Sequence, residues 1–353
     1  SIGALALTAN TTAADNTAVG MSALTANTTG CRNTAVGTCS LENNTTGCQN
    51  SSLGWCSLFT NTSGCDNIAI GGGALLSNTT ACYNTAVGKS ALQANTTGNQ
   101  LVAVGRSALA ANTTGGCNTA VGKDAMLANT TGANNAAVGQ AALDSNTEGN
   151  SNVAMGRNSL ASNTTAGNNT GIGAFSLEQN STGTGNTAVG QLSLNRNTTA
   201  SNNTAVGRQA LETNTTGTQN VAVGNESLGS NTEGNYNVAV GRLALYENTT
   251  ASNNTAVGLS ALEKNTTGTS NVAVGRCALA TNISGGTNTA VGYNSLTLNT
   301  ACCNSAVGYN SLTNNSSGAN NSAMGHSALG GNTTASNNAA FGCGALSANT
   351  TGV

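Results

Sequence analysis

The chain has 353 residues, with 46 Gly, 11 Cys, one His and no Pro, and only 6% of its residues are charged. So low a charge argues against a disordered, solvated tail, and a net charge of −2 provides no overall field that would attract nucleic acid. The sequence contains no run of about 18 apolar residues, so we expect no membrane-spanning segment.

A 17-residue repeat organises the whole sequence. The pentapeptide Asn16-Thr17-Ala18-Val19-Gly20 returns at Asn33 and Asn84, and the consensus is N-T-A-V-G-x-S-A-L-x-x-N-T-T-G-x-x. We number repeat positions from its first Asn. About 21 copies fill the chain, and the copy from Asn288 to Cys303 is one residue shorter because it lacks a Thr. We predict one continuous array over residues 1–353, an excerpt of a longer fibre.

The composition of the repeat predicts an all-β fold. A 17-residue unit is too short for a helical hairpin of the known solenoid families, and Thr, Val, Asn and Gly disfavour helix. Short strands separated by Gly and Asn corners fit better. We therefore predict a parallel β-solenoid (β-roll) of about 21 rungs. With rungs about 4.8 Å apart, the array is a rod on the order of 100 Å long.

The first predicted strand of each rung includes positions 2 to 4. Position 4 is always apolar, as in Val19 and Phe341, and position 2 accepts Val102, so we expect both side chains to face the core. Position 5 is Gly in every copy, which fits a corner with positive φ. Position 9 is Leu in every copy except Met126. These columns predict a narrow apolar core.

The second half of the rung carries polar columns. Position 12 is Asn in every copy, which fits a left-handed corner and a ladder of amide hydrogen bonds between rungs. Position 13 accepts Ile283, so we expect it to point inward. Position 14 accepts Glu148 and Glu233, so we expect it to be exposed.

Positions 3 and 8 hold only small residues, almost always Ala or Ser. If positions 2 and 4 face the core, strand alternation turns position 3 outward, where a solvated face would accept charged side chains. Two interpretations remain. These positions are tight inward sites of a strongly bent coil, or a neighbouring chain packs against a smooth Ala column. We favour the second, because a chain with so thin a core gains most from burying another face.

The repeat resembles a known family of surface proteins. The motifs Ala18-Val19-Gly20, Ala69-Ile70-Gly71 and Ala222-Val223-Gly224 are similar to the short repeats of trimeric autotransporter adhesin heads of the YadA type. The longer pattern N-T-A-V-G-x-x-A-L-x-x-N-T-T-G also looks like repeats of phage-type tail fibres. This resemblance implies a parallel β-roll, three chains packed together and a role in surface attachment.

Residues that could carry catalysis are scarce. His326 lies at position 6 without a Cys or carboxylate at ligand spacing, and the acidic residues are scattered along the chain. The A-x-G and N-T-T-G strings are predicted corners, with no following helix to hold a phosphate. We therefore predict no catalytic, cofactor or metal site, and a protein that is not an enzyme.

Basic residues follow the repeat more closely. Seven of the ten Lys and Arg fall at position 6, including Lys89, Arg106, Lys123 and Arg157. Like charges about 5 Å apart repel one another, so this row either lies in water or meets an anionic partner. Tyr309 shares the same position, as do Trp55 and Tyr293, and would suit a contact with a glycan or polyanion. The alternative is a solubilising edge beside the Gly corner.

Cysteines also lie in register. Position 16 of four consecutive rungs is Cys, and position 7 of two rungs is Cys. Cα atoms about 4.8 Å apart are within disulfide range, although parallel Cβ vectors add strain. We predict a possible disulfide ladder, which fits an oxidising extracellular setting. The alternative is that Cys fills a column of small side chains. The residues are Cys31, Cys48, Cys65 and Cys82 at position 16, and Cys39 and Cys56 at position 7.

The Asn at position 12 begins an N-x-[S/T] glycosylation motif in 18 of 21 copies. Candidate sites include Asn27, Asn95, Asn112 and Asn129. In a secretory pathway, glycans on these residues would give a sugar-coated rod. Rungs about 4.8 Å apart leave little room for a glycan on each, so the ladder and turn are the simpler reason for this Asn.

Three functions are compatible with these patterns. The first is a structural and adhesive fibre on a cell or virion surface, self-associated as a homotrimer or filament, with a surface glycan or host-surface ligand as partner. The second is ice binding by a Thr-rich solenoid, or a glycosylated structural filament. The third is a polyanion or glycan binder along position 6. We expect an extracellular location.

Overall fold

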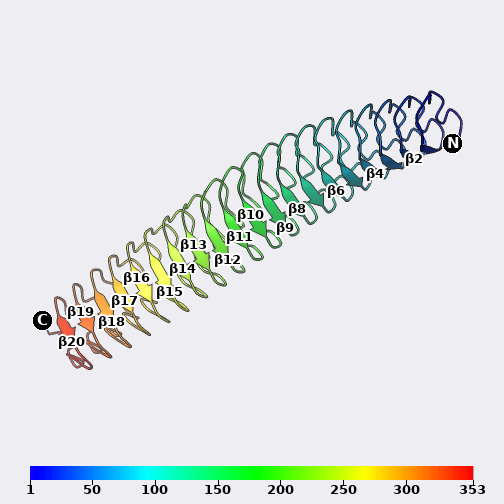
Figure 1. Cartoon of the computed structure of the whole chain (residues 1–353). Coiled ribbons are helices and arrows are strands. Elements are labelled where there is room, and N and C mark those ends of the chain that lie inside the picture. The colour runs from blue at the N-terminus through cyan, green and yellow to red at the C-terminus, as the bar shows by residue number, and fades with distance from the viewer. Residues whose placement is uncertain (353) are drawn as a thin grey trace. The chain divides into compact units, whose positions relative to one another are not determined.

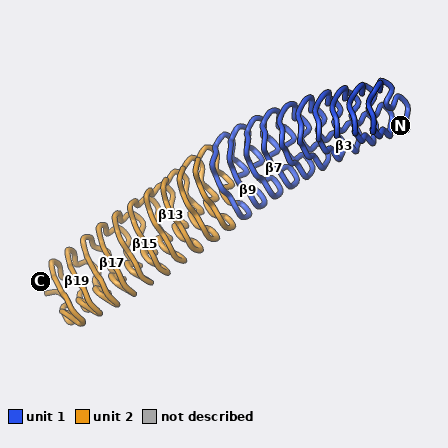
Figure 2. The backbone as a smooth tube through the Cα atoms, in the orientation of Figure 1, with its two compact units in different colours: residues 1–175 blue, residues 176–353 orange. Residues whose placement is uncertain are grey.

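The computed structural model describes residues 1–352 and confirms a parallel β-solenoid with a 17-residue repeat. Among these residues the regular elements are 20 short strands and no helix. The chain forms two compact units, residues 1–175 and residues 176–353 (Figure 2). Each unit is described by itself.

Unit 1 contains one parallel sheet of the strands β1 to β10 (Figure 1). Neighbouring strands pair in register with an offset of one repeat, so that Thr17 lies beside Thr34 and Val19 beside Val36. Identical repeat positions therefore stack on one another, as the sequence predicts. The strands are β1 Thr17–Val19, β2 Thr34–Val36, β3 Ser51–Leu53, β4 Ile68–Ile70, β5 Thr85–Val87, β6 Val102–Val104, β7 Thr119–Val121, β8 Ala136–Val138, β9 Val153–Met155 and β10 Thr170–Ile172.

Unit 2 repeats this arrangement with the strands β11 to β20. The register is maintained even at the shortened copy, where Thr289 pairs with Ser305 and Val291 with Val307. The strands are β11 Thr187–Val189, β12 Thr204–Val206, β13 Val221–Val223, β14 Val238–Val240, β15 Thr255–Val257, β16 Val272–Val274, β17 Thr289–Val291, β18 Ser305–Val307, β19 Ser322–Met324 and β20 Ala339–Phe341.

Hydrogen bonds between rungs continue beyond the strands. The backbone N–H of Leu41 donates to Ser57 O at 3.0 Å, and the N–H of Thr45 donates to Thr62 O at 2.9 Å. Position 13 adds its side chain, because the Thr45 hydroxyl also donates to Thr62 O at 3.0 Å. Each rung is thus bonded to its neighbours on several sides of its cross-section, which gives each unit regular stacking.

The core is thin and is filled from positions 3, 8 and 9. Ala35 at position 3 and Leu41 at position 9 have 0% exposure, as do almost all their equivalents. Our prediction for the strand was therefore wrong: position 3 points inward, and positions 2 and 4 point outward. Phe341 at position 4 is 69% exposed, and Ile283 at position 13, also predicted to point inward, is 52% exposed. The small residues at positions 3 and 8 are tight inward sites, and no second chain is needed to cover them.

Two columns of buried Asn complete the interior. At position 12, the Asn44 amide donates to Asn27 Oδ1 at 2.9 Å and to Gly47 O at 2.9 Å. At position 1, the Asn33 amide donates to the same Gly47 carbonyl at 2.8 Å, and the N–H of Asn50 donates to Asn33 Oδ1 at 3.0 Å. These bonds satisfy groups that would be costly to bury unpaired. The predicted Asn ladder is confirmed, and a second one runs beside it.

The backbone confirms one predicted corner and contradicts the other. Position 5 Gly has positive φ in every rung, such as +137° at Gly122, and a Cβ there would collide with the Gly139 carbonyl. The left-handed conformation otherwise occurs at positions 7, 9 and 17, as in Cys39, Leu41 and Gln49, and not at the position 12 Asn. The left-handed corner predicted at position 12 was therefore wrong. Its Asn is retained for the amide ladder.

The shortened copy interrupts one step of this ladder. Its Asn299 amide donates to Ala301 O at 2.7 Å, whereas the Oδ1 of Asn282, one rung earlier, is buried with no hydrogen-bond partner. The ladder resumes at the next rung, where the Asn315 amide donates to Asn299 Oδ1 at 2.8 Å. Loss of one residue therefore interrupts the Asn ladder at this step and leaves the sheet pairing intact.

Candidate interaction surface

The outward side of the strands is a continuous uncharged surface within each unit. We call this surface the sheet face; it consists of the side chains at positions 2 and 4 of each strand. No strand carries a charged residue at either position. Many of these apolar side chains are well exposed, including Leu53 at 49%, Ile70 at 40% and Val104 at 37%. A solvated face would accept Lys or Glu, as positions 6 and 10 do, so this face has the composition of an interface.

One part of the sheet face in unit 2 is unusually uniform. In β11 to β17 every outward side chain is Thr or Val: position 4 is always Val, and position 2 is either Thr or Val. Thr and Val have nearly the same shape and are stiff at χ1. They form a regular grid, with about 4.8 Å between rungs and about 7 Å between the two columns.

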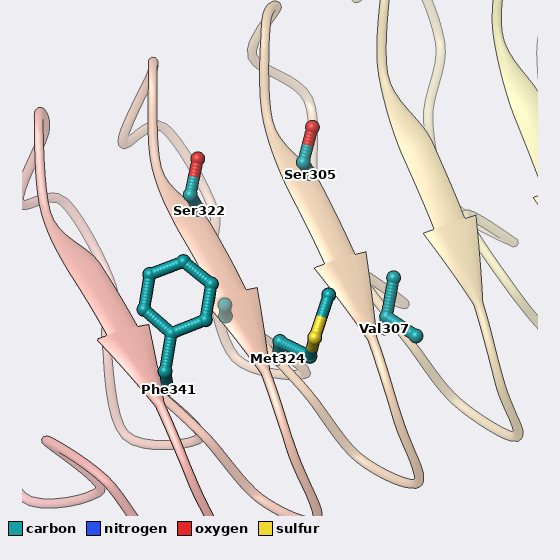
Figure 3. Close-up of a pocket in the computed structure, with 6 residues that line it drawn as sticks. Ser305, Val307, Ser322, Met324 and Phe341 are labelled. Atoms are coloured by element: carbon teal, nitrogen blue, oxygen red, sulfur yellow. The ribbon is translucent and has the colours of Figure 1, made fainter.

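The sheet face ends differently at β18 to β20. Here Met324 and Phe341 replace Val, and their side chains project from the face with that of Val307 (Figure 3). They border a shallow hollow of about 180 Å³, whose polar side is formed by Ser305 and Ser322. The hollow suits a single apolar side chain.

The predicted basic column lies on the border of the sheet face, because position 6 follows the Gly corner. Lys89, Arg106, Lys123 and Arg157 are all exposed. Asp124 partly neutralises the row, since its carboxylate lies 3.5 Å from Arg106 Nη2 and 3.3 Å from Lys123 Nζ.

Two other basic residues of this row also have partners. The Arg157 guanidinium lies 4.6 Å from the centre of the Phe175 ring, and Arg208 pairs with Glu226 at 3.8 Å. Sequence reasoning missed these partners, of which Asp124 and Glu226 are at position 7. The field available to a polyanion is therefore weaker than the row of cations predicts.

Aromatic residues at position 6 stack on one another. The rings of Tyr293 and Tyr309 lie 5.1 Å apart, and Tyr309 and His326 lie 5.2 Å apart, both with an interplanar angle of 8°. Arg276 continues the stack, 5.5 Å from the Tyr293 ring centre. A sugar stacks on an open ring face. Here most ring faces are covered by their neighbours, so a glycan would meet mainly ring edges. Trp55, at the same position in unit 1, is 65% exposed.

The cysteines of the predicted columns lie in register, and their side chains are thiols. All eleven cysteines are free, and the Sγ atoms of Cys31 and Cys48 are 3.1 Å apart, a hydrogen-bond distance and well above the roughly 2.05 Å of a disulfide bond. The backbone N–H groups of Cys48 and Cys65 donate to the Sγ of the next rung at 3.1 Å, to Cys65 and Cys82 respectively. The pair at position 7, Cys39 and Cys56, is half-buried.

The thiols differ in acidity. A hydrogen bond with Glu42 raises the pKa of Cys39 to about 12, and burial raises the pKa of Cys56. By contrast, the Thr287 hydroxyl, 3.2 Å from Cys303 Sγ, lowers the pKa of Cys303, with a further contribution from Cys302.

The candidate glycosylation sites are in the interior. Asn27, Asn95, Asn112 and Asn129 have 0% exposure. Each side-chain amide nitrogen, to which a glycan would be attached, already donates two hydrogen bonds within the ladder. A glycan there would displace a buried bond and would have no path to solvent without opening the rung.

Other site types are not formed in the described part of the chain. His326 Nδ1 lies 3.1 Å from the Ser327 hydroxyl and against the Tyr309 ring. No group of three or more His, Cys, Asp or Glu side chains within residues 1–352 is arranged to hold a metal ion. In the same residues, no helix is sufficiently long and apolar to cross a membrane.

The structure thus brings the predicted basic and cysteine columns into register and buries the predicted glycosylation sites. Sequence reasoning did not identify the sheet face, because it assigned the apolar residues at positions 2 and 4 to the core. A usable signal was Leu101, the apolar replacement at position 1, which indicates that position 1 is buried. Strand alternation then turns positions 2 and 4 outward. No protein-family model matches this chain, and no curated protein matches it in sequence.

Proposed function

We propose that the protein is a structural and adhesive fibre of a cell or virion surface, in which copies associate side by side through the sheet face. The observation that carries this proposal is the exposed, uncharged composition of positions 2 and 4 in both units. Ten strands about 4.8 Å apart and about 10 Å wide give a face of about 480 Å² in each unit. A stable interface buries about 800 Å² per partner, so the sheet face of each unit supplies more than half of that area by itself.

The resemblance to trimeric adhesin heads and tail fibres supports three further parts of the proposal. These are a homotrimer, an extracellular location and attachment to a surface glycan or host-surface ligand. A repeating β-solenoid without a deep cavity in its described residues suits a structural role better than catalysis, so we propose that the protein is not an enzyme.

Charge placed on the sheet face tests the association. The double variant Val206→Lys and Val223→Lys adds two charges to adjacent strands of the regular grid, where both side chains already contact solvent. The matched control, Thr199→Lys and Thr216→Lys, adds the same charges at exposed position 14. Sedimentation equilibrium should give oligomers for the native chain and the control, and monomers for the face variant. A native chain that remains monomeric at micromolar concentration refutes the proposed function.

Attachment is tested separately, on immobilised acidic and neutral glycans. If the position 6 row contributes, binding should fall as salt rises and should weaken in the variant Arg106→Ser with Lys123→Ser. Binding that is unchanged in this variant assigns adhesion to another surface.

Ice binding is a second candidate function, and the surface that suits it is part of the sheet face. The position 13 hydroxyls are used within the array, as in the bond from Thr28 to Thr45 O at 3.1 Å. The grid of Thr and Val on β11 to β17 offers a flat, periodic surface instead. Ice binding needs the sheet face exposed, whereas association covers it. A monomer that produces thermal hysteresis would therefore favour ice binding. The glycosylated filament receives no support from the buried position 12 amides.

A further inference from the structure

We infer that the cysteine column at position 16 of unit 1 is a binding site for the soft cation Cu(I), in which each ion is held by the thiolates of two adjacent rungs. The column consists of four half-buried cysteines on consecutive rungs: Cys31, Cys48, Cys65 and Cys82. The sheet face consists of other positions, so this inference does not depend on the association of copies. It departs from the metal-free chain that we expected from the sequence, because that expectation considered the spacing of His and carboxylate ligands.

Three of the four side chains have the same conformation. The Sγ atoms of Cys48, Cys65 and Cys82 each accept a hydrogen bond at 3.1 Å from the backbone N–H at position 16 of the preceding rung. Each Sγ also lies 3.5–3.6 Å from the position 14 carbonyl oxygen of its own rung. Side chains that repeat in one conformation place their sulfurs one rung apart, at about 4.8 Å. The N–H donors also stabilise the negative charge that a sulfur carries as a ligand.

This spacing fits a cation with two sulfur ligands. A bond from a thiolate to a first-row metal ion is about 2.3 Å long, so two such bonds in a line span about 4.6 Å, close to the distance between rungs. Thiolates prefer soft ions, and Cu(I), which has a filled d shell, is stable with two thiolates on opposite sides. The stacking of the rungs therefore sets the ligand spacing that Cu(I) requires.

The same geometry excludes a four-coordinate site within the column. The sulfurs of a tetrahedral zinc site lie within about 4 Å of one another. Cys31 and Cys82 are three rungs apart, which is about 14 Å along the stack. This agrees with the absence, within residues 1–352, of any group of three or more ligands arranged around one metal ion. A two-coordinate ion needs only one neighbouring pair.

Four thiols in a line hold two ions. Because the bonds of a bridging sulfur are strongly bent, an ion above and an ion below cannot share one thiolate in a straight line. The pairs are therefore Cys31 with Cys48, and Cys65 with Cys82. Cys31 Sγ lies 3.1 Å from Cys48 Sγ, and a turn about χ1 to the conformation of the other three gives the spacing of the rungs. Each ion replaces two S–H protons, which pass to solvent, and no electron is transferred.

A structural role alone does not require cysteine at position 16. In other rungs Asn and Ser accept the same backbone bond, from Ala133 to Asn150 Oδ1 at 2.7 Å and from Asn235 to Ser252 Oγ at 3.0 Å. Sulfur is a weaker acceptor than either oxygen. Four consecutive cysteines therefore supply metal ligands that the fold itself does not use. Because Ser makes this bond elsewhere, Ser can also replace each Cys without loss of the hydrogen bond.

Copper uptake by two matched variants tests the arrangement. Reduced protein is dialysed without oxygen against Cu(I) buffered by a chelator, and bound copper is counted per chain. The inner variant, Cys48→Ser with Cys65→Ser, leaves two thiols three rungs apart and should bind two ions fewer than the native chain. The outer variant, Cys31→Ser with Cys82→Ser, removes the same number of thiols but leaves an adjacent pair, and should bind only one ion fewer. Ions held by cysteines elsewhere in the chain cancel in this comparison.

Alkylation of the native chain locates the ions. Bound Cu(I) should protect all four column cysteines from iodoacetamide, as mapped by mass spectrometry, whereas the same concentration of Zn²⁺ should leave them reactive. Equal copper uptake by the inner and outer variants overturns the inference, because the arrangement in a line would then have no effect. Uptake by the inner variant equal to that of the native chain, or protection by Zn²⁺ equal to that by Cu(I), also overturns it.

Discussion

The Asn ladder at position 12 allows a quantitative prediction for one residue. The Asn129 amide donates to Asn112 Oδ1 at 2.8 Å and to Gly132 O at 3.0 Å, and its Oδ1 accepts from the Asn146 amide at 2.8 Å. The substitution Asn129→Ala removes all three bonds in a site with 0% exposure.

The groups left behind are affected unequally. Gly132 O still accepts from Asn118 at 2.7 Å, and the Asn146 amide still donates to Gly149 O at 3.1 Å. Asn112 Oδ1 loses the ladder bond that it accepts from the following rung. Three lost bonds at about 1 kcal/mol each, with about 1–3 kcal/mol for one unsatisfied buried acceptor, predict a loss of about 4–6 kcal/mol in the stability of these rungs.

Native-state hydrogen exchange measures this loss locally, which matters because a repeat array need not unfold in a single step. The amides of the rungs that contain Asn112, Asn129 and Asn146 should exchange faster in Asn129→Ala, by an amount equivalent to that free energy. The control Thr131→Ala alters an exposed side chain of the same rung and should change stability by less than about 0.5 kcal/mol. Equal effects of the two substitutions would refute the ladder as a source of stability.

Three further predictions concern the position 5 Gly, the shortened rung and the cysteine thiols. Gly122→Ala should lower the stability measured by thermal unfolding by about 1–3 kcal/mol, because φ of +137° strains a residue with a Cβ. The control Gly132→Ala should lower stability less, since other rungs carry Ala at the same position 15, and equal losses would contradict this reasoning. A Thr inserted after Thr300 should restore the interrupted ladder step and stabilise the flanking rungs by about 1 kcal/mol in urea unfolding, and destabilisation would contradict it. In the reduced protein, mass mapping of iodoacetamide adducts near pH 8 should find Cys303 modified first and Cys39 last. The thiolate is the reactive form, the pKa of Cys303 is lowered, and the pKa of Cys39 is raised to about 12. The opposite order of modification would contradict these pKa shifts.

The periodicity of the sequence was sufficient to predict stacking. A strict 17-residue spacing with invariant Gly and Asn has a simple physical origin in columns of identical residues, and the strand register confirms it. The direction of the side chains was harder to predict. An apolar column such as position 4 can line a core or an interface, and composition alone does not distinguish the two. The decisive constraint was the buried polar Asn at position 1, since alternate residues of a strand, here positions 1, 3 and 5, share one side.

Two other features could not be read from residue types. Leu is a poor candidate for the left-handed conformation, yet it adopts positive φ at position 9 because the stacked rung fixes its backbone on both sides. The partial neutralisation of the basic row depends on Asp124 at position 7, whose carboxylate reaches Arg106 on the preceding rung as well as Lys123 on its own. That contact arises from the three-dimensional arrangement of rungs and not from sequence spacing alone.

The shortened rung has an evolutionary consequence. A missing residue between Asn299 and Asn304 leaves the pairing of β17 with β18 intact, and the disturbance ends after one neighbour. Because energetic coupling in such an array is limited to adjacent units, whole copies can be gained or lost by recombination between nearly identical stretches of DNA without refolding the remainder. The length of the array is therefore a trait that selection can adjust in steps of a single turn.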